Sequence, residues 1–212
     1  MREDMKVKET PKDTLINSII ETEWFLFDKV QNVSGRCGCQ DDEWTFYVNR
    51  YSQFNAWGMD TLRSYAADLE TALKEGRNPI TEKYAYMMET TDPEYYHDSL
   101  EPYLPAISER KAKLVEAITT VMVSLEHQFE LKYPNFSRGS RPLAVSAAGD
   151  VSTALYSTGE LKTYSENTLA FLAQDLEKAI KEGRSIPKEI HERVVKFYGY
   201  QNMEDAESKL GA

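Results

Sequence analysis

One stretch of this chain occurs twice, and that repetition constrains the fold more than any other feature. The residues TLRSYAADLETALKEGR at 61–77 return 107 positions later as TLAFLAQDLEKAIKEGR at 168–184. Eleven of the seventeen aligned positions are identical. Repeated segments at a fixed spacing are typical of chains built from similar structural units that pack on one another. The repeat therefore predicts two similar helical halves that face each other, with room for a pocket along their shared axis.

Hydrophobic periodicity assigns the fold class. Apolar residues recur at three- and four-residue spacing along most of the chain, and no segment alternates as a β-strand does. The helices that this pattern predicts span 13–31, 44–57, 60–76, 81–90, 114–129, 167–182 and 185–198. Their expected N-caps are Asp41 or Asp42, then Asp60, Asp150 and Ser185, and Gly76 and Gly183 follow the repeated helices as C′ residues.

We therefore predict a single all-α domain, a helical bundle of two pseudo-repeated four-helix halves over residues 1–212. The first half spans 12–101 and the second half spans 102–200. Three prolines interrupt the crossing between them, which is too short and too apolar to act as a free linker. We expect residues 201–212 to form an acidic, frayed tail.

The composition of the chain argues against some classes of binding partner. The chain has 212 residues and a net charge of −10, whereas nucleic-acid binding needs a basic surface. No apolar run is long enough to cross a bilayer, and the charged start MREDMKVKETPKDT lacks a secretory core. With only two cysteines, a disulfide-stabilised secreted fold is not expected. The sequence predicts a cytoplasmic protein with neither a nucleic-acid nor a membrane partner.

Both cysteines lie in one glycine-containing loop, 34–42, with the sequence SGRCGCQDD. The matching loop of the second half, 137–143, keeps an arginine and a glycine but has no cysteine. Four interpretations of Cys37 and Cys39 remain open. A thiol beside Arg36 and a helix start could be a nucleophile, the two thiols could form a reversible disulfide, they could bind a metal, or they could be ordinary loop residues.

Two arginines in equivalent loops form a second candidate site. If the halves pack about a twofold axis, Arg36 and Arg141 would approach one cavity and hold a carboxylate or phosphate, with Gln40 beside them. The alternative is that each arginine pairs with a nearby acidic residue. Glu23 lies on the apolar stripe of its helix, where burial would raise its pKa and suit it to proton transfer, or where it could pair with Arg50.

The histidines carry a weaker signal. Glu94 and His97 have the Glu-x-x-His spacing of di-iron bundles, but no second pair of this kind occurs in the chain. No phosphate-binding glycine loop or zinc-protease signature is present. The sequence therefore predicts no metal site and identifies no cofactor.

Several short segments, taken in their order along the chain, carry a family resemblance. They are Glu23-Trp24, Gly35-Arg36 with Cys39-Gln40-Asp41, Ser52-Gln53 with Trp57, Gly76-Arg77-Asn78, Lys83-Tyr84-Ala85, Arg141-Pro142, and Gly159-Glu160-Leu161 with Thr163-Tyr164-Ser165. From about 12 to 200 the chain resembles a bacterial family, the domain of unknown function 4125. The resemblance implies a cytosolic bacterial protein and brings no assigned activity.

These observations lead to one functional expectation and one alternative. We expect a cytosolic small-molecule enzyme or ligand-binding protein that holds a small anionic molecule between the two halves. Its ligand-binding residues would be Arg36, Gln40, Arg50 and Arg141; in an enzyme, Cys39 would be the nucleophile and Glu23 the proton shuttle. The alternative is a non-catalytic, acidic helical module for protein interaction. Substrate, reaction, cofactor and oligomeric state are not assigned by the sequence.

Overall fold

The structure is a computed structural model that describes residues 10–31, 35–144 and 151–212. Over these residues the chain forms helices and no β-strand, which confirms the predicted all-α class. In chain order the elements are α1 (Pro11–Asp28), η1 (Gly38–Asp41), α2 (Glu43–Asn55), α3 (Met59–Lys74), α4 (Pro79–Thr91), α5 (Pro93–Tyr95), η2 (Tyr96–Leu100), η3 (Glu101–Tyr103), α6 (Glu109–Lys132), α7 (Pro134–Ser137), α8 (Thr153–Leu161), α9 (Glu166–Lys181), α10 (Ile186–Phe197) and α11 (Met203–Leu210).

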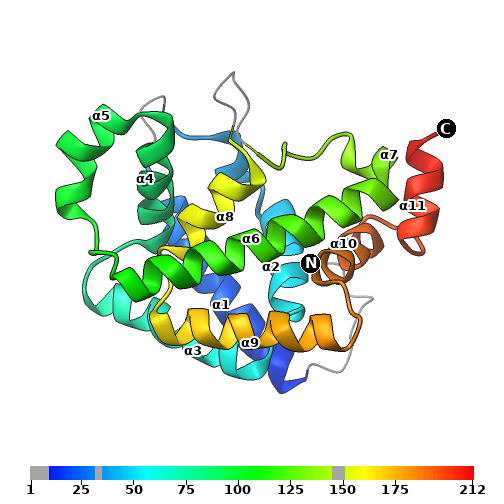
Figure 1. The fold of residues 1–212 in the computed structure, drawn as a ribbon, viewed down its shortest axis with the longest axis horizontal. Helices are drawn as coiled ribbons and strands as arrows, with labels where there is room; N and C mark the ends of the chain where they lie inside the picture. Colours follow the sequence, from blue (N-terminus) through cyan, green and yellow to red (C-terminus); the bar gives the residue numbers. More distant parts are fainter. Residues whose placement is uncertain (1–9, 32–34, 145–150) are drawn as a thin grey trace.

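The longest helix, α6, crosses the molecule and packs on α7, α8, α9 and α10 (Figure 1). Helices α3 and α9 lie side by side along one edge, α4 and α5 lie at one end, and α7 and α11 at the other. Helix α1 packs on α2 and α3, and α6 packs in the same way on α8 and α9. Helix α4 packs on α8, and α10 packs on α2. None of the described helices combines the length and the apolarity that crossing a bilayer requires.

The two repeated segments form α3 and α9, and their ends are built alike. Gly76 and Gly183 take positive φ values of 70° and 68°, as a C′ residue requires. The next backbone N–H groups, of Arg77 and Arg184, donate to the carbonyls five residues earlier across 2.8 and 2.9 Å. This is the Schellman arrangement, and it explains why the Gly-Arg pair returns with the repeat.

Each repeated helix also caps the other. Asp68 of α3 accepts hydrogen bonds from the N–H of Ser165 (2.8 Å) and the hydroxyl of Thr168 (2.6 Å), at the start of α9. The same arrangement holds in reverse at the start of α3, where the acceptor is Asp175 and the donors are the Gly58 N–H (2.7 Å) and the Thr61 hydroxyl (2.5 Å). These contacts link residues at a constant offset of 107 positions.

The predicted N-caps are confirmed in part. Asp42 caps α2 and Ser185 caps α10, each through a side-chain oxygen that accepts a backbone N–H. The prediction of Asp60 is wrong: α3 begins after Gly58, whose N–H is already bound by Asp175, so Asp60 lies exposed in the first turn. Asp150 lies outside the described residues.

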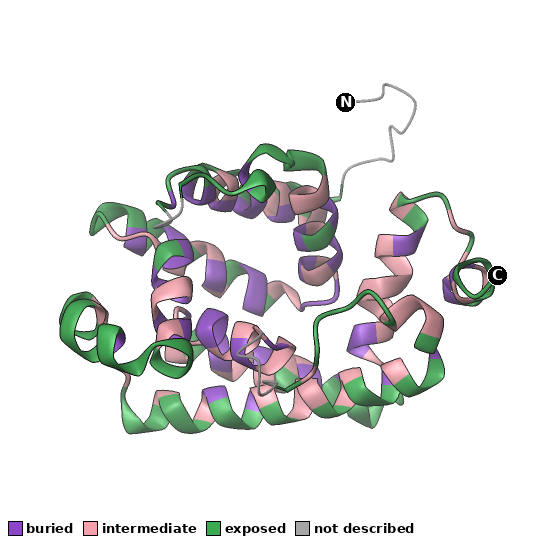
Figure 2. Ribbon diagram, turned by 90° about the horizontal axis from the view of Figure 1, so that it is seen from above, coloured by how far each residue is buried: buried purple, intermediate pink, exposed green. Residues whose placement is uncertain are grey.

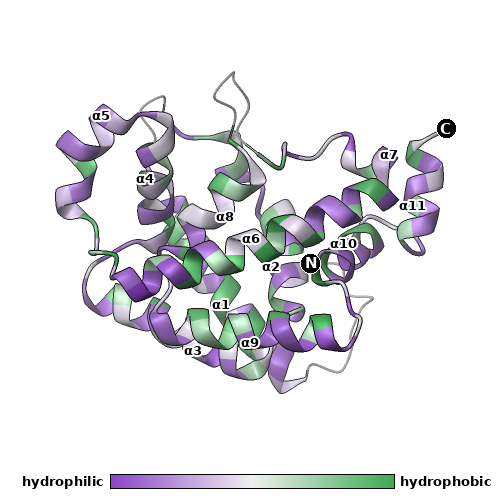
Figure 3. Cartoon of the chain, in the orientation of Figure 1, coloured by the Kyte–Doolittle hydropathy of each residue, from purple (hydrophilic) through white to green (hydrophobic). Residues whose placement is uncertain are grey.

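Buried residues line the faces on which these helices contact one another and form the core (Figure 2). Its main part unites buried apolar residues of α1, α2, α3, α4, α6, α8, α9 and α10. The apolar faces of α1 and α6 turn inward, whereas the outer edges of the helices are hydrophilic (Figure 3). A second, smaller cluster lies where α6, α10 and α11 meet, with Phe129, Val195 and Met203 at its centre.

This second cluster corrects the expected frayed tail. Residues after Gly199 turn back through the positive φ of that glycine, and Asn202 caps α11. Met203 and Ala206 are fully buried, at a spacing that places both on one face of the helix. The Glu207 carboxylate accepts the first backbone N–H groups of α7 at 2.8 Å. Although this segment is acidic, it forms a short helix that docks on the rest of the protein.

Candidate functional site

A buried ion pair links α1 to α2 at the centre of the molecule. Arg50 donates from Nε to one oxygen of Glu23 (2.7 Å) and from Nη2 to the other (2.5 Å). The Tyr65 hydroxyl of α3 donates to the same carboxylate at 2.6 Å. Glu23 is fully buried, and both of its oxygens are bound. Of the two alternatives for Glu23, the structure shows the pairing with Arg50.

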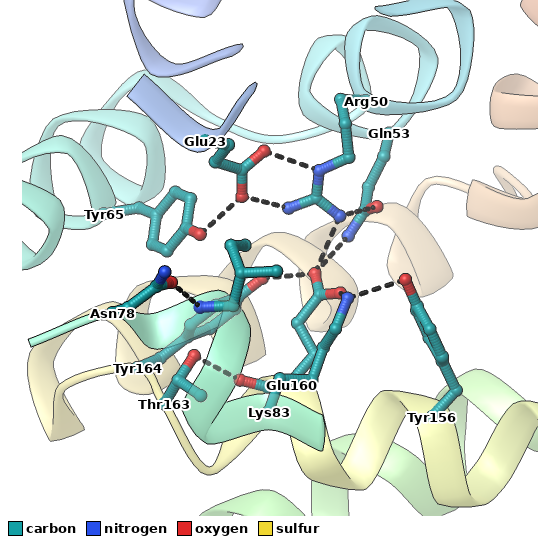
Figure 4. Close-up of polar contacts among 11 residues, drawn as sticks. Glu23, Arg50, Gln53, Tyr65, Asn78, Lys83, Tyr156, Glu160, Thr163 and Tyr164 are labelled. Atoms are coloured by element: carbon teal, nitrogen blue, oxygen red, sulfur yellow. Dashed lines mark hydrogen bonds and ion pairs between the residues drawn. The ribbon is translucent and has the colours of Figure 1, made fainter. Parts of the chain in front are cut away.

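A second carboxylate, Glu160 of α8, completes the cluster (Figure 4). It accepts hydrogen bonds from Arg50 (2.9 Å), from Gln53 (3.2 Å) and from the Tyr164 hydroxyl (2.7 Å). The ammonium of Lys83, on α4, lies 3.5 Å from its other oxygen. Four helices thus contribute charged groups to one polar centre, with two carboxylates matched by two cations.

Electrostatics fix the ionisation of this centre. Burial alone would raise the pKa of Glu160, but Arg50 and Lys83 outweigh burial and hold that pKa well below its usual range. Burial would lower the pKa of Lys83, yet the Glu160 carboxylate and neighbouring tyrosines leave it above the ordinary value. Burial, with Glu23 and Glu160 nearby, raises the pKa of Tyr65 and Tyr164. Glu160 and Lys83 are therefore charged near neutral pH, and the two tyrosines are neutral donors.

A tyrosine at the edge of this cluster, Tyr156, contacts two cations. The Tyr156 hydroxyl accepts a hydrogen bond from Lys83 Nζ at 2.6 Å, and this nitrogen lies 4.1 Å from the ring centroid. The guanidinium of Arg141 lies 4.2 Å from the centroid of the same ring. Burial raises the pKa of the adjacent Tyr84 to about 12, and Cys39 and Arg141 lie close enough to act on that hydroxyl.

The two predicted arginines therefore occupy different settings. Arg36 is exposed and pairs with Asp28 (2.7 Å) and Asp41 (2.9 Å), so the local-carboxylate alternative describes it. Arg141 is exposed and stacks on Tyr156, and in the described part of the chain no carboxylate pairs with it. Arg50, predicted as a ligand contact, is instead enclosed in the ion cluster.

Gln40 is buried and acts as a structural anchor. Its amide nitrogen donates to the carbonyls of Phe27 (2.9 Å) and Val30 (3.0 Å), at the end of α1. Its amide oxygen accepts the backbone N–H of Cys37 at 2.9 Å. The 36–42 segment is thereby held on the end of a rigid helix, with Cys37 and Cys39 exposed beside it.

Sequence reasoning missed several members of the cluster, above all Lys83, Glu160, Tyr65 and Tyr164. A signal for one of them was present, because Glu160 lies 107 residues after Gln53, at the spacing of the repeat. In the structure Gln53 and Glu160 are hydrogen-bonded at 3.2 Å. Trp57 and Tyr164 have the same offset, and their rings lie 5.9 Å apart.

Other candidate features lie elsewhere. Among residues 10–31, 35–144 and 151–212, no group of three or more metal-ligating side chains is placed to hold a metal. His97 pairs with Glu101 at 2.8 Å. Two shallow hollows, of about 240 and 450 Å³, lie between α4 and η2–η3 and at the start of α6. Neither hollow is lined by a residue of the ion cluster.

Fold and site together define an all-helical protein organised around a buried, charge-balanced polar centre. The chain matches the family model described as "Protein of unknown function (DUF4125)" over residues 13–208 and belongs to this family. Comparison with curated proteins and with solved structures gives no match.

Proposed function

We propose that this protein binds a small anionic molecule at the edge of the ion cluster, beside Tyr156. The observation that carries the proposal is the setting of Arg141. Its guanidinium is exposed and is oriented by the Tyr156 ring, but no described carboxylate neutralises it. A planar guanidinium with free donors matches carboxylate and phosphate oxygens.

The neighbouring groups support an anion at this position. The Lys83 ammonium lies against the same tyrosine and is held charged by Glu160. Two cations on one ring create a local positive potential in a chain whose net charge is −10. In this proposal Glu23, Arg50 and Gln40 hold the scaffold, and Cys37 and Cys39 are the nearby thiols that an enzymatic version would use. The proposed location is the cytoplasm, where thiols stay reduced.

The test compares two arginines of the same loop. Isothermal titration with inorganic phosphate and with citrate would be run on the wild type, on Arg141→Met and on Arg138→Met. Arg138 is exposed and donates to Asn135 at 2.9 Å, so its replacement removes the same charge at a different place. We expect binding that falls at least about tenfold in Arg141→Met, which corresponds to about 1.4 kcal/mol, and is unchanged in Arg138→Met. Equal loss in both variants, or no binding by the wild type, would contradict the proposal.

We also propose that the architecture consists of two interlocked four-helix halves, α1–α4 and α6 with α8–α10. The support is the pairing of contacts: α1 on α2 and α6 on α8, α4 on α8 and α10 on α2. The reciprocal caps of Asp68 and Asp175 obey the same relation. Under this proposal the ion cluster lies near the pseudo-twofold axis, and each half supplies one of its carboxylates.

The second candidate is a non-catalytic interaction module. It is favoured by the local pairing of Arg36 and by exposed aromatic side chains on α2 and at the end of α10, where Trp44 and Tyr198 are 53% and 51% exposed. This candidate predicts that the double variant Trp44→Ser/Tyr198→Ser loses a protein partner while phosphate and citrate titrations stay flat for the wild type.

A further inference from the structure

The Cys37-Gly38-Cys39 segment places two exposed thiols in direct contact. The Sγ atom of Cys39 lies 3.0 Å from the Sγ atom of Cys37. Both residues are exposed, and neither is in a disulfide. Closure of a disulfide between them needs a further approach of about 1 Å, because an S–S bond is about 2.05 Å long.

The rest of the loop holds the two sulfurs in this arrangement. The Cys37 N–H is fixed by the buried Gln40, which is itself bound to the end of α1. Arg36 bridges the same segment by donating to the Gln40 carbonyl (2.8 Å) and to Asp28 (2.7 Å). Two reacting groups held in place react with a high effective concentration, because the entropy of bringing them together is already lost.

The two thiols differ chemically. Hydrogen bonds from the Cys39 thiol and from the Cys39 backbone N–H lower the pKa of Cys37. Burial and the neighbouring Cys37 sulfur raise the pKa of Cys39. Cys37 is therefore the first of the two thiols to become a thiolate, and the thiolate is the attacking species.

We propose that Cys37 and Cys39 form a thiol–disulfide exchange site for small-molecule disulfides, with Cys37 as the attacking thiol and Cys39 as the resolving thiol. In the first step the Cys37 thiolate attacks one sulfur of a disulfide RSSR, forms Cys37–S–S–R and releases RS⁻. Cys39 then loses its proton and attacks the Cys37 sulfur, which releases the second RS⁻. The dithiol is oxidised by two electrons, and RSSR is reduced to two thiols.

The surroundings leave room for such a substrate. A Cβ placed on Gly38 would meet no atom within 4 Å, and the loop faces solvent. The site does not depend on the anion proposed at Arg141, because the sulfur contact and its Gln40 anchor involve neither Arg141 nor Tyr156. Two equivalents of a thiol would return the disulfide to the dithiol, so exchange is reversible.

To test this proposal, the reduced protein is mixed with glutathione disulfide, and its intact mass is followed over time by mass spectrometry. Three chains are compared: the wild type, Cys39→Ser and Cys37→Ser. The wild type is expected to lose two hydrogens without a lasting adduct and to regain them with dithiothreitol. Cys39→Ser is expected to accumulate one glutathionyl group on Cys37, because no resolving thiol remains.

The comparison of rates tests the assignment of roles. Cys37→Ser is expected to gain its adduct at least about tenfold more slowly than Cys39→Ser, since its remaining thiol is less ionised at neutral pH. A stable adduct on the wild type would overturn the proposal, as would equal rates in the two variants. Both variants retain Arg141, so phosphate binding in them shows whether the anion site is intact independently of this result.

Discussion

At the residue scale, the polar centre depends on complete pairing. Glu23, Arg50, Lys83 and Glu160 are each less than 10% exposed, and each has an opposite charge within 4 Å. A buried pair of this kind does not add much to stability compared with an apolar core, but removal of one partner leaves the other charge unpaired and buried. The cluster therefore adds little to the free energy of unfolding, but it disfavours any other packing of its four helices, because such a packing would leave a buried charge unpaired.

The residue-scale prediction concerns Glu160→Gln. The amide keeps the shape but leaves Arg50 with Glu23 as its carboxylate partner and removes the carboxylate that faces Lys83. We expect the free energy of unfolding at pH 7 to fall by about 3–5 kcal/mol in urea denaturation. The exposed pair partner Glu177→Gln serves as a control, with an expected change below about 1 kcal/mol.

The stability difference between the wild type and Glu160→Gln should also depend on pH. The folded-state pKa of Glu160 lies below the ordinary value of 4.5 for a glutamate, so its stabilising charge is fully present above pH 4.5 and is lost as the pH falls further. The difference between the wild type and Glu160→Gln should therefore shrink between pH 5 and pH 3. A difference that stays constant over this range would show that the charge of Glu160 is not the cause.

At the element scale, the repeated helices are fixed to one another by their reciprocal caps. Asp68 and Asp175 each place a carboxylate at the start of the opposite helix, where free N–H groups and the helix dipole favour negative charge. Helices α4 and α8 pack closely because a glycine, Gly159, lies where they cross. A Cβ on Gly159 would lie 2.8 Å from the Lys83 carbonyl, so only glycine permits this crossing, which also brings Glu160 to Lys83.

The element-scale prediction uses the equivalence of the two caps. Asp68→Ala and Asp175→Ala should each lower the free energy of unfolding by about 1–3 kcal/mol, the usual range for hydrogen bonds to a charged group. The two losses should agree within about 1 kcal/mol, because the donors are equivalent. Asp60→Ala, an exposed acid of the same first turn, is the matched control. Chemical denaturation that shows a large loss at only one of the two positions would count against a pseudo-twofold relation.

At the scale of the whole molecule, the fold has a main core and a satellite cluster closed by α11. The satellite joins α6, α10 and α11 through Phe129, Val195 and Met203. The last helix therefore covers apolar surface that the other helices leave at this end of the molecule (Figure 1).

The prediction at this scale concerns Met203→Ala. Met203 is fully buried, and its truncation should cost about 2–5 kcal/mol and lower Tm. Ser208→Ala lies on the exposed side of the same helix and should leave Tm within about 1 °C. If calorimetry shows equal Tm values for both variants, α11 is not docked in solution.

The sequence by itself determined the helical class and the C-terminal ends of the repeated helices, and it offered the pairing of Glu23 with Arg50 as one of two alternatives. These follow from local rules: periodicity of apolar residues, Gly-Arg at a helix end, and a charge that needs a partner on an apolar stripe. The same rules failed for residues 201–212, because α11 is stabilised by docking onto α6 and α10 and not by its own composition.

Only the tertiary structure decided which groups join the polar centre and which stay at the surface. Lys83 and Glu160 are 77 positions apart in the sequence, and they meet because α4 packs on α8 at Gly159. Arg36, which was expected to share a cavity with Arg141, is satisfied by Asp28 and Asp41 close by in the sequence. Short-range pairs are readable along a chain, whereas a buried charge cluster depends on the packing of whole helices.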